Sequence, residues 1–360
     1  MVIDGARVGR YARAGSRWAR LLTRRRTEPG TRVFYGHDLV PGSDDPATGG
    51  TAKMQRLAAR FPSSPTDFTL LYLGSTWLPR DLGVLLWLAR RRDIPIVLNQ
   101  NGVGYPAWAG DEADAVNHPL RDALQAARHV LYQSEFCKRS ADKFLGTPSG
   151  PSEVLYNAVD VERFVPAPEM PTGGPVLLAG GDQTQGAYRV ELALQTFARV
   201  VADHSDARLI VTGNLLSDPG ELVRRLGLED SVTFVGRYSQ ADAPSLYRGA
   251  HLLLHTQMND SCPSVVLEAM ACGLPVVHPE SGGTVELVGN VGGIGVEHEA
   301  SWDRLVPPSA EAMASAVAHV LDQLPAYSSF ARGRAVERFS LAPWLDRHAE
   351  LFRELTGESG

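Results

Sequence analysis

Cysteine and lysine are both scarce in this chain. Its three cysteines, Cys137, Cys262 and Cys272, are widely spaced along 360 residues. They form neither the paired framework of small secreted domains nor the close spacing of a zinc site. We therefore expect free thiols, no metal site and a reducing, cytoplasmic compartment. With only three lysines, nearly all of the positive charge is carried by arginine.

Long apolar runs are absent as well. No stretch of about eighteen apolar residues occurs, which argues against a transmembrane helix. The N-terminus also lacks the apolar core of a signal peptide. A hydrophobic content of 44% and a formal net charge of −6 are those of an ordinary globular protein. Because 360 residues are many for one hydrophobic core, two domains are expected.

Positive charge is concentrated at the N-terminus. Residues 1–30 contain eight arginines against Asp4 and Glu28, a local charge of +6, so the other 330 residues sum to −12. If the segment is helical, Trp18 and Leu21 can share an apolar face beside the arginines. This pattern is typical of a helix that lies on an anionic membrane surface. Three glycines weaken such a helix, and a disordered basic arm or a packed extra helix is the alternative.

Short apolar runs alternate with helical stretches along the rest of the chain, which predicts parallel α/β domains. The runs that predict strands lie near residues 32–35, 68–73, 94–98, 130–132, 176–178, 209–214, 232–236, 252–254 and 276–277. Proline and glycine between residues 166 and 175 predict a linker. We therefore expect a first domain at 31–165, a second at 166–342 and a final helix at 343–355.

The stretch from Asn259 to Glu286 has the most distinctive pattern. An apolar strand precedes Asp260, and a helix that contains Glu268 starts near Pro263. A second strand then leads to Gly282-Gly283 and another helix. Helix N-termini favour anions, and carboxylates accept hydrogen bonds from hydroxyls, so the pattern suits a ligand with phosphates and a sugar. The alternative is an ordinary Rossmann-like unit with a solvated acid at each end.

This stretch resembles a known family, the retaining glycosyltransferases of family four. The resemblance rests on Asp260 and Glu268 with seven residues between them, Ala269-Met270-Ala271, Gly273, Pro275-Val276-Val277, Gly282-Gly283 and Glu286. A second match, Asn157 to Phe164, lies a hundred residues away. The resemblance implies the GT-B fold, in which two Rossmann-like doubly wound domains face a central cleft. It also implies that the final helix crosses back to the first, acceptor-side domain.

The resemblance assigns roles to individual residues. Glu268 would hold the ribose of a nucleotide sugar, and Asp260, one methylene shorter than the family's usual Glu, would hold the sugar. Arg189 would replace the cations that family members carry after the first glycine loop of the second domain, where this chain has Asp182. Asn101 stands where the family often has a His, and it cannot act as a general base. The catalytic candidates are therefore Asp260, Arg189 and Asn101.

The donor-binding candidates share glycine-rich loops or helix starts. They are Glu268, Gly49, Gly50, Gly181, Arg237, Cys262, Pro263, Ser264, Val265, Gly283 and Glu286. The resemblance implies a nucleoside-diphosphate sugar as donor substrate, no cofactor and no metal. The expected partners are this nucleotide sugar, a carbohydrate or lipid-linked acceptor, and an anionic membrane surface bound through residues 1–30, without nucleic acid.

We therefore expect a glycosyltransferase that moves a sugar to an acceptor hydroxyl with retention, in polysaccharide or glycolipid assembly. It would be cytoplasmic and peripheral on the inner face of the membrane. Two alternatives use the same donor pocket. One is a nucleotide-sugar epimerase, which would need an acid/base residue in the cleft. The other is a catalytically inactive donor-binding subunit, which the departures at Asn101 and Asp182 favour.

Overall fold

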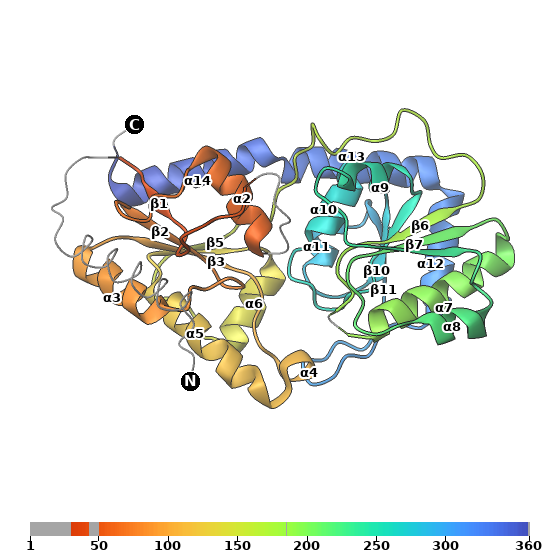
Figure 1. The fold of residues 1–360 in the computed structure, drawn as a ribbon, viewed down its shortest axis with the longest axis horizontal. Helices are drawn as coiled ribbons and strands as arrows, with labels where there is room; N and C mark the ends of the chain where they lie inside the picture. Colours follow the sequence, from red (N-terminus) through yellow and green to blue (C-terminus); the bar gives the residue numbers. More distant parts are fainter. Residues whose placement is uncertain (1–29, 43–49, 185, 359–360) are drawn as a thin grey trace, which may run out of the picture.

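The structure, a computed structural model, describes residues 30–42, 50–184 and 186–358. Two lobes lie side by side, each built on a parallel sheet with helices against it (Figure 1). The first sheet has five strands and the second has six, which confirms the expected pair of α/β domains. Residues 1–29, on which the membrane prediction rests, and Gly49 lie outside the described residues. None of the described helices combines the length and apolar character needed to cross a bilayer.

The first sheet has the strand order β1-β2-β3-β4-β5, and all neighbouring strands are parallel. Its strands are β1 (Val33–Phe34), β2 (Leu70–Gly74), β3 (Ile96–Gln100), β4 (His129–Tyr132) and β5 (Ser152–Val154). Both β2 and β3 are buried along their whole length, which explains why their sequences do not alternate between apolar and polar residues.

The helices of the first lobe follow its strands in the sequence. They are α2 (Gly50–Arg60), α3 (Leu82–Arg92), α4 (Pro106–Ala109), α5 (Ala113–Ala126) and α6 (Glu135–Phe144), with a short 3-10 helix at Gly110–Glu112. Helix α6 begins after Ser134, whose hydroxyl accepts a hydrogen bond from the Cys137 amide at 3.0 Å. This cap fixes the start of α6 at the side of the lobe that faces the second sheet (Figure 1).

The second sheet has the order β11-β10-β9-β6-β7-β8, again with parallel neighbours. Its strands are β6 (Val176–Ala179), β7 (Arg208–Thr212), β8 (Val232–Gly236), β9 (Leu252–Leu254), β10 (Val276–Pro279) and β11 (Gly293–Val296). Within this sheet the chain enters at β6, continues outward through β7 to β8, and then returns to form β9 on the other side of β6. Ligands of doubly wound sheets bind beyond the strand ends at such a switch point.

The helices of the second lobe cover both faces of its sheet. They are α7 (Tyr188–Asp203), α8 (Gly220–Leu226), α9 (Ala243–Arg248), α10 (Ser264–Ala271), α11 (Thr284–Val288), α12 (Ala310–Asp322) and α13 (Leu324–Phe339). The last helix, α14 (Leu341–Thr356), lies on the first lobe instead (Figure 1). Its Trp344, Leu351 and Phe352 are buried there, and His348 Nε2 lies 3.1 Å from the Tyr72 hydroxyl. The last helix thus packs against the first sheet, across from the lobe that precedes it in the sequence.

Candidate functional site

Two loops of the second lobe meet at the switch point of its sheet. The first, residues 255–263, connects β9 to α10, and the second connects β10 to α11. They are pressed together at Gly282 and Gly283, where an added Cβ would collide with the backbone of residues 259–261. Gly283 also donates its amide to the Asp260 carbonyl at 2.7 Å, and Gly282 has a φ of +71°. This packing sets the starts of α10 and α11 side by side, which explains the need for glycine.

Asp260 lies in the first of these loops, beside two buried basic side chains. Arg189, in the first turn of α7, is 2% exposed and donates a hydrogen bond to the Asp182 carbonyl. His255, which follows β9, is 1% exposed, and its Nε2 lies 3.7 Å from Asp260 Oδ2. Burial raises the pKa of Asp260 to about 6, and the charge of Arg189 opposes the shift. The structure thus brings the two predicted catalytic residues of the second lobe together.

The sequence pattern did not single out His255. Burial, and then the charges of Arg189 and His278, lower the pKa of its imidazole well below the usual value, so the ring is neutral at pH 7. The sequence feature that could have pointed to His255 is its position directly after an apolar strand, at the edge of the sheet where ligands bind. That signal becomes specific only when the sheet order places β9 at the switch point.

Glu268 lies on α10 and is only 4% exposed. One carboxylate oxygen accepts a hydrogen bond from the Tyr247 hydroxyl at 2.9 Å. The other is 3.3 Å from a guanidinium nitrogen of Arg56, which belongs to α2 in the first lobe. Burial raises the pKa of Glu268, and Arg56 opposes the shift. Glu268, which is predicted to bind the ribose, is therefore already hydrogen-bonded to residues of both lobes.

Other donor-binding candidates surround the start of α10. Pro263 is its N-cap, and Ser264 and Val265 form its first turn after the buried Cys262. Gly181, with a φ of +86°, packs against Val265, since an added Cβ would lie 3.3 Å from the Val265 side chain. Arg237 follows β8 and is exposed. The loop after β6 therefore contacts the first turn of α10.

The first lobe presents a buried amide and a buried cation to the same region. Gly50 starts α2, and Lys53 in its first turn is 4% exposed. Lys53 Nζ donates to Asn99 Oδ1 at 2.8 Å and to Asn101 Oδ1 at 3.1 Å. Burial lowers the pKa of Lys53 to about 7. Asn101 Nδ2 also donates to the Thr76 hydroxyl at 2.7 Å, so both ends of the predicted catalytic amide are occupied.

A chain of buried amides connects this lysine to the second lobe. Gln133 Nε2 donates to Asn99 Oδ1 at 2.8 Å, and Asn157 Nδ2 donates to Gln133 Oε1 at 3.1 Å. The same Asn157 nitrogen donates to the Cys262 carbonyl at 2.8 Å. Every member of the chain is buried. Buried amides that lose part of their hydrogen bonds destabilise the protein, so this series of hydrogen bonds favours one relative position of the two lobes.

Glu286 connects the lobes more directly. Its two carboxylate oxygens accept hydrogen bonds from the backbone amides of Glu135 and Phe136, each at 2.7 Å, and the Tyr156 hydroxyl donates to one of them at 3.1 Å. The carboxylate thus covers the start of α6, where free amides and the helix dipole favour a negative charge. A donor contact by Glu286 would have to replace one of these partners.

A tryptophan makes a second bridge between the lobes. The loop after β11 reaches the first lobe near α4 (Figure 1), where the Ala107 amide donates to the Trp302 carbonyl at 2.8 Å. The Trp302 ring stacks on Phe136, with centroids 5.3 Å apart, and meets Tyr105 and Phe144 edge-on. The described conformation is therefore closed around the loops of the candidate site.

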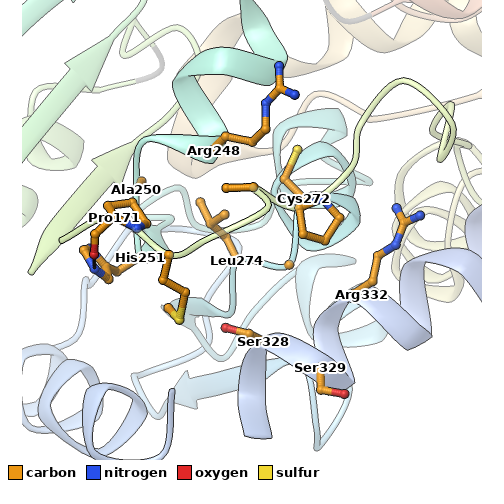
Figure 2. A pocket seen from close by; sticks show the side chains of 13 residues that line it. Pro171, Arg248, Ala250, His251, Cys272, Leu274, Ser328, Ser329 and Arg332 are labelled. Carbon is orange, nitrogen blue, oxygen red and sulfur yellow. Dashed lines mark hydrogen bonds between the residues drawn. The ribbon is translucent and has the colours of Figure 1, made fainter. Parts of the chain in front are cut away.

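A cavity of about 290 Å³ lies elsewhere, and Figure 2 shows its lining. His251 and Leu274, which line it, precede β9 and β10. The cavity is thus at the amino ends of the strands, opposite to the edge where ligands of such sheets bind. Arg332, also in its lining, is held by the carbonyls of Phe164 and Ala271. Among the described residues, no three His, Cys, Asp or Glu side chains are grouped to hold a metal ion.

Comparisons with known proteins agree with this architecture. A family model described as "Glycosyltransferase Family 4" matches residues 13–163, and one described as "Glycosyl transferases group 1" matches residues 174–323. A D-inositol 3-phosphate glycosyltransferase of Mycolicibacterium smegmatis is 26% identical over 293 residues, which are 75% of this chain and 64% of that protein. Another, from Catenulispora acidiphila, is 26% identical over 59% of this chain and 55% of its own length. The chain thus spans less than two thirds of the length of either relative.

Solved structures show the same fold at lower identity. HepE of Anabaena, in complex with UDP and glucose, has a TM-score of 0.66 at 19% identity and covers 84% of this chain and 81% of its own. Sucrose-phosphate synthase of Thermosynechococcus elongatus has a TM-score of 0.65 at 18% identity and covers 82% of this chain and 75% of its own. Two parallel sheets, the switch-point loops and two family models that together span both lobes lead to one conclusion: the chain belongs to the group 1 glycosyltransferases of family 4, with the GT-B fold.

Proposed function

We propose that this protein transfers a sugar from a nucleoside-diphosphate sugar to a hydroxyl of an acceptor. One observation carries the proposal. Two carboxylates, Asp260 before α10 and Glu268 within it, lie near the switch point of the second sheet, with buried Arg189 beside the first. Carboxylates that accept hydrogen bonds from hydroxyls and a cation for phosphate are the chemistry that a nucleotide sugar requires.

The donor would lie along the second lobe. Glu268 would exchange Arg56 for the ribose hydroxyls when the lobes open, while Tyr247 keeps its other oxygen in place. The amides at the start of α10 and α11 and the guanidinium of Arg189 would hold the diphosphate and stabilise it as a leaving group. Asp260 would hold the sugar next to the carbon that reacts. Arg237 lies where the base would meet the loop after β8.

The reaction itself breaks the bond between the sugar carbon and the phosphate oxygen and forms one to the acceptor oxygen. The diphosphate leaves with the bonding electrons, and its departing oxygen takes up the proton that the acceptor hydroxyl loses. Asn101 cannot take this proton, because an amide is not a base at neutral pH. Family membership supports retention at the sugar carbon and a metal-independent reaction, with Arg189 and the helix N-termini supplying positive charge.

The acceptor would enter from the first lobe. We propose a carbohydrate or lipid-linked hydroxyl, in polysaccharide or glycolipid assembly, and attachment to anionic membrane through the arginine-rich residues 1–30. The curated relatives are named for a transfer that involves a phosphorylated inositol, and HepE was solved with UDP and glucose. These names make UDP-glucose the first donor to test and inositol phosphate one of the first acceptors.

Release of free nucleoside diphosphate tests the proposal. The protein is incubated with a panel of nucleotide sugars, with and without acceptors, and the products are separated. Enzyme-dependent release of diphosphate that increases with an acceptor supports a transferase. A changed but intact nucleotide sugar would identify an epimerase, and tight donor binding without any turnover would identify an inactive donor-binding subunit.

A further inference from the structure

Several buried polar atoms without a hydrogen-bond partner lie next to Asp260. In the described part of the chain, eleven buried side-chain nitrogen or oxygen atoms have no hydrogen-bond partner. Three of them belong to two neighbours of Asp260: both ring nitrogens of His255 and Nε of Arg189. An unsatisfied buried donor or acceptor is destabilising, and folds retain such groups mainly where function requires them. The clustering therefore indicates a polar ligand at this point.

The distance between His255 and Asp260 restricts the chemical group with which the ligand can contact them. His255 Nε2 and Asp260 Oδ2 are 3.7 Å apart, which is too long for a direct hydrogen bond. One oxygen atom can nevertheless lie at hydrogen-bond distance, about 2.8 Å, from both. A neutral imidazole offers one N–H, while the carboxylate only accepts. The atom between them must accept from one and donate to the other, and a hydroxyl group does both.

The charges around this point restrict the ligand further. Burial, and then the charge of Arg189, keep the ring of His255 neutral, and the neighbouring His278 is also buried, with its pKa lowered to about 4. Asp260 is the carboxylate nearest to the ring. A second carboxylate placed between His255 and Asp260 would face a neutral donor on one side and a like charge on the other. The position therefore suits a neutral hydroxyl and disfavours an acidic group.

We propose that His255 determines donor-sugar specificity, by donating a hydrogen bond to a hydroxyl of the transferred sugar that at the same time donates to Asp260. The inference rests on the proposed function and deepens it. The donor is a nucleoside-diphosphate sugar with a free hydroxyl at this position, and a donor that is deoxygenated or oxidised to an acid there is rejected. Arg189, which has its own unpaired Nε, then remains available for phosphate.

The test compares donors and variants in one scheme. Turnover is measured for a nucleotide sugar that the wild type accepts and for its deoxy analogues, one hydroxyl at a time. The variants are His255→Phe, which keeps a ring but removes both nitrogens, and His255→Asn, which keeps an N–H. The control is His251→Asn, because His251 is buried at the opposite end of β9 with both nitrogens hydrogen-bonded.

We expect the wild type and His251→Asn to discriminate against one deoxy analogue by a factor of about ten to a hundred in kcat/KM, since its two buried polar partners are left unpaired. In His255→Phe that factor should fall about three- to tenfold, because only the hydrogen bond to Asp260 then distinguishes the intact donor from its analogue, and His255→Asn recovers part of the loss. Affinity for the nucleoside diphosphate alone stays unchanged in all variants, which shows that they fold.

Equal discrimination by the wild type and His255→Phe would overturn the inference while leaving the transferase intact. The inference also fails if His255→Phe weakens binding of the bare diphosphate as much as turnover, because the role would then be structural. If the wild type releases no diphosphate from any donor, the proposed function fails and the inference with it. Should His255→Phe not fold, His255→Met, which also lacks a side-chain N–H, provides the comparison.

Discussion

Glu286 offers the most direct test of how the lobes are held together. In the structure its carboxylate accepts hydrogen bonds from the amides of Glu135 and Phe136, which belong to the other lobe, and from the hydroxyl of Tyr156, which packs against Phe339. Glu286→Ala removes all three interactions and leaves the start of α6 uncovered. Glu286 is half-buried on α11, so the substitution changes the contact between the lobes and not the core of either one.

The size of the effect follows from the three interactions. A hydrogen bond to a charged group contributes about 1.5–3 kcal/mol, and a negative charge at a helix N-terminus about 0.3–1 kcal/mol. In the open state water replaces part of these contacts, so we expect a net loss of about 2–3 kcal/mol. Because about 1.4 kcal/mol is a factor of ten, the population of the closed conformation relative to the open one should decrease about 30- to 100-fold.

Amide hydrogen exchange measures this change at the contact itself. The amides of Glu135 and Phe136 should exchange about 30 to 100 times faster in Glu286→Ala than in the wild type, and small-angle scattering should show a larger radius of gyration. Glu280→Ala is the matched control, since Glu280 is an exposed carboxylate in the loop that leads to α11. Unchanged protection of both amides in Glu286→Ala would refute the assignment of Glu286 as a bridge.

The other predictions concern the ligands and the buried charges. Glu268→Ala should weaken nucleotide binding by about 1.5–3 kcal/mol in calorimetry, since the ribose loses a charge-assisted hydrogen bond, and unchanged affinity would reject the ribose role. Arg189→Ala should weaken nucleoside diphosphate more than nucleoside, and equal losses would make Arg189 a bystander. Lys53→Met should flatten the pH dependence of stability: with a pKa of about 7 when folded and about 10.4 when unfolded, the wild type gains about 2 kcal/mol from pH 7 to 9, measured by urea unfolding. Removal of residues 1–30 should abolish salt-sensitive sedimentation with anionic vesicles, and equal sedimentation of both chains would contradict the membrane role.

Sequence patterns predicted the parts of this fold that are local. The strand before Asp260 and the helix that carries Glu268 are where the apolar runs and the proline predicted them. Several elements were missed, among them strands β5 and β11 and helices α8 and α13. Helix α13 buries mainly Ala331, Ala335 and Phe339, a stripe too weak to stand out beside its serines and glycine. Strand β11 is rich in glycine, which argues against a strand, and it is held in place by pairing with β10.

The contacts between the lobes could not be predicted in this way. Arg56 and Glu268 are 212 residues apart, and Glu286 lies 150 residues from Phe136, whose amide donates to it. No periodicity in either segment encodes the pairing, because the partners meet only after both sheets have formed. His255 is a similar case, since its significance depends on the return of the chain from β8 to β9 across β6.

The most direct test of the proposed activity is the fate of a nucleotide sugar that the protein binds. We predict that the wild type, given the donor and an accepted hydroxyl compound, forms free nucleoside diphosphate and glycosylated acceptor in equal amounts. Asp260→Ala should form neither, while it still binds the bare nucleoside diphosphate. Wild-type protein that binds the donor but returns it unchanged with every acceptor, or converts it to another intact nucleotide sugar, would contradict the assignment as a transferase.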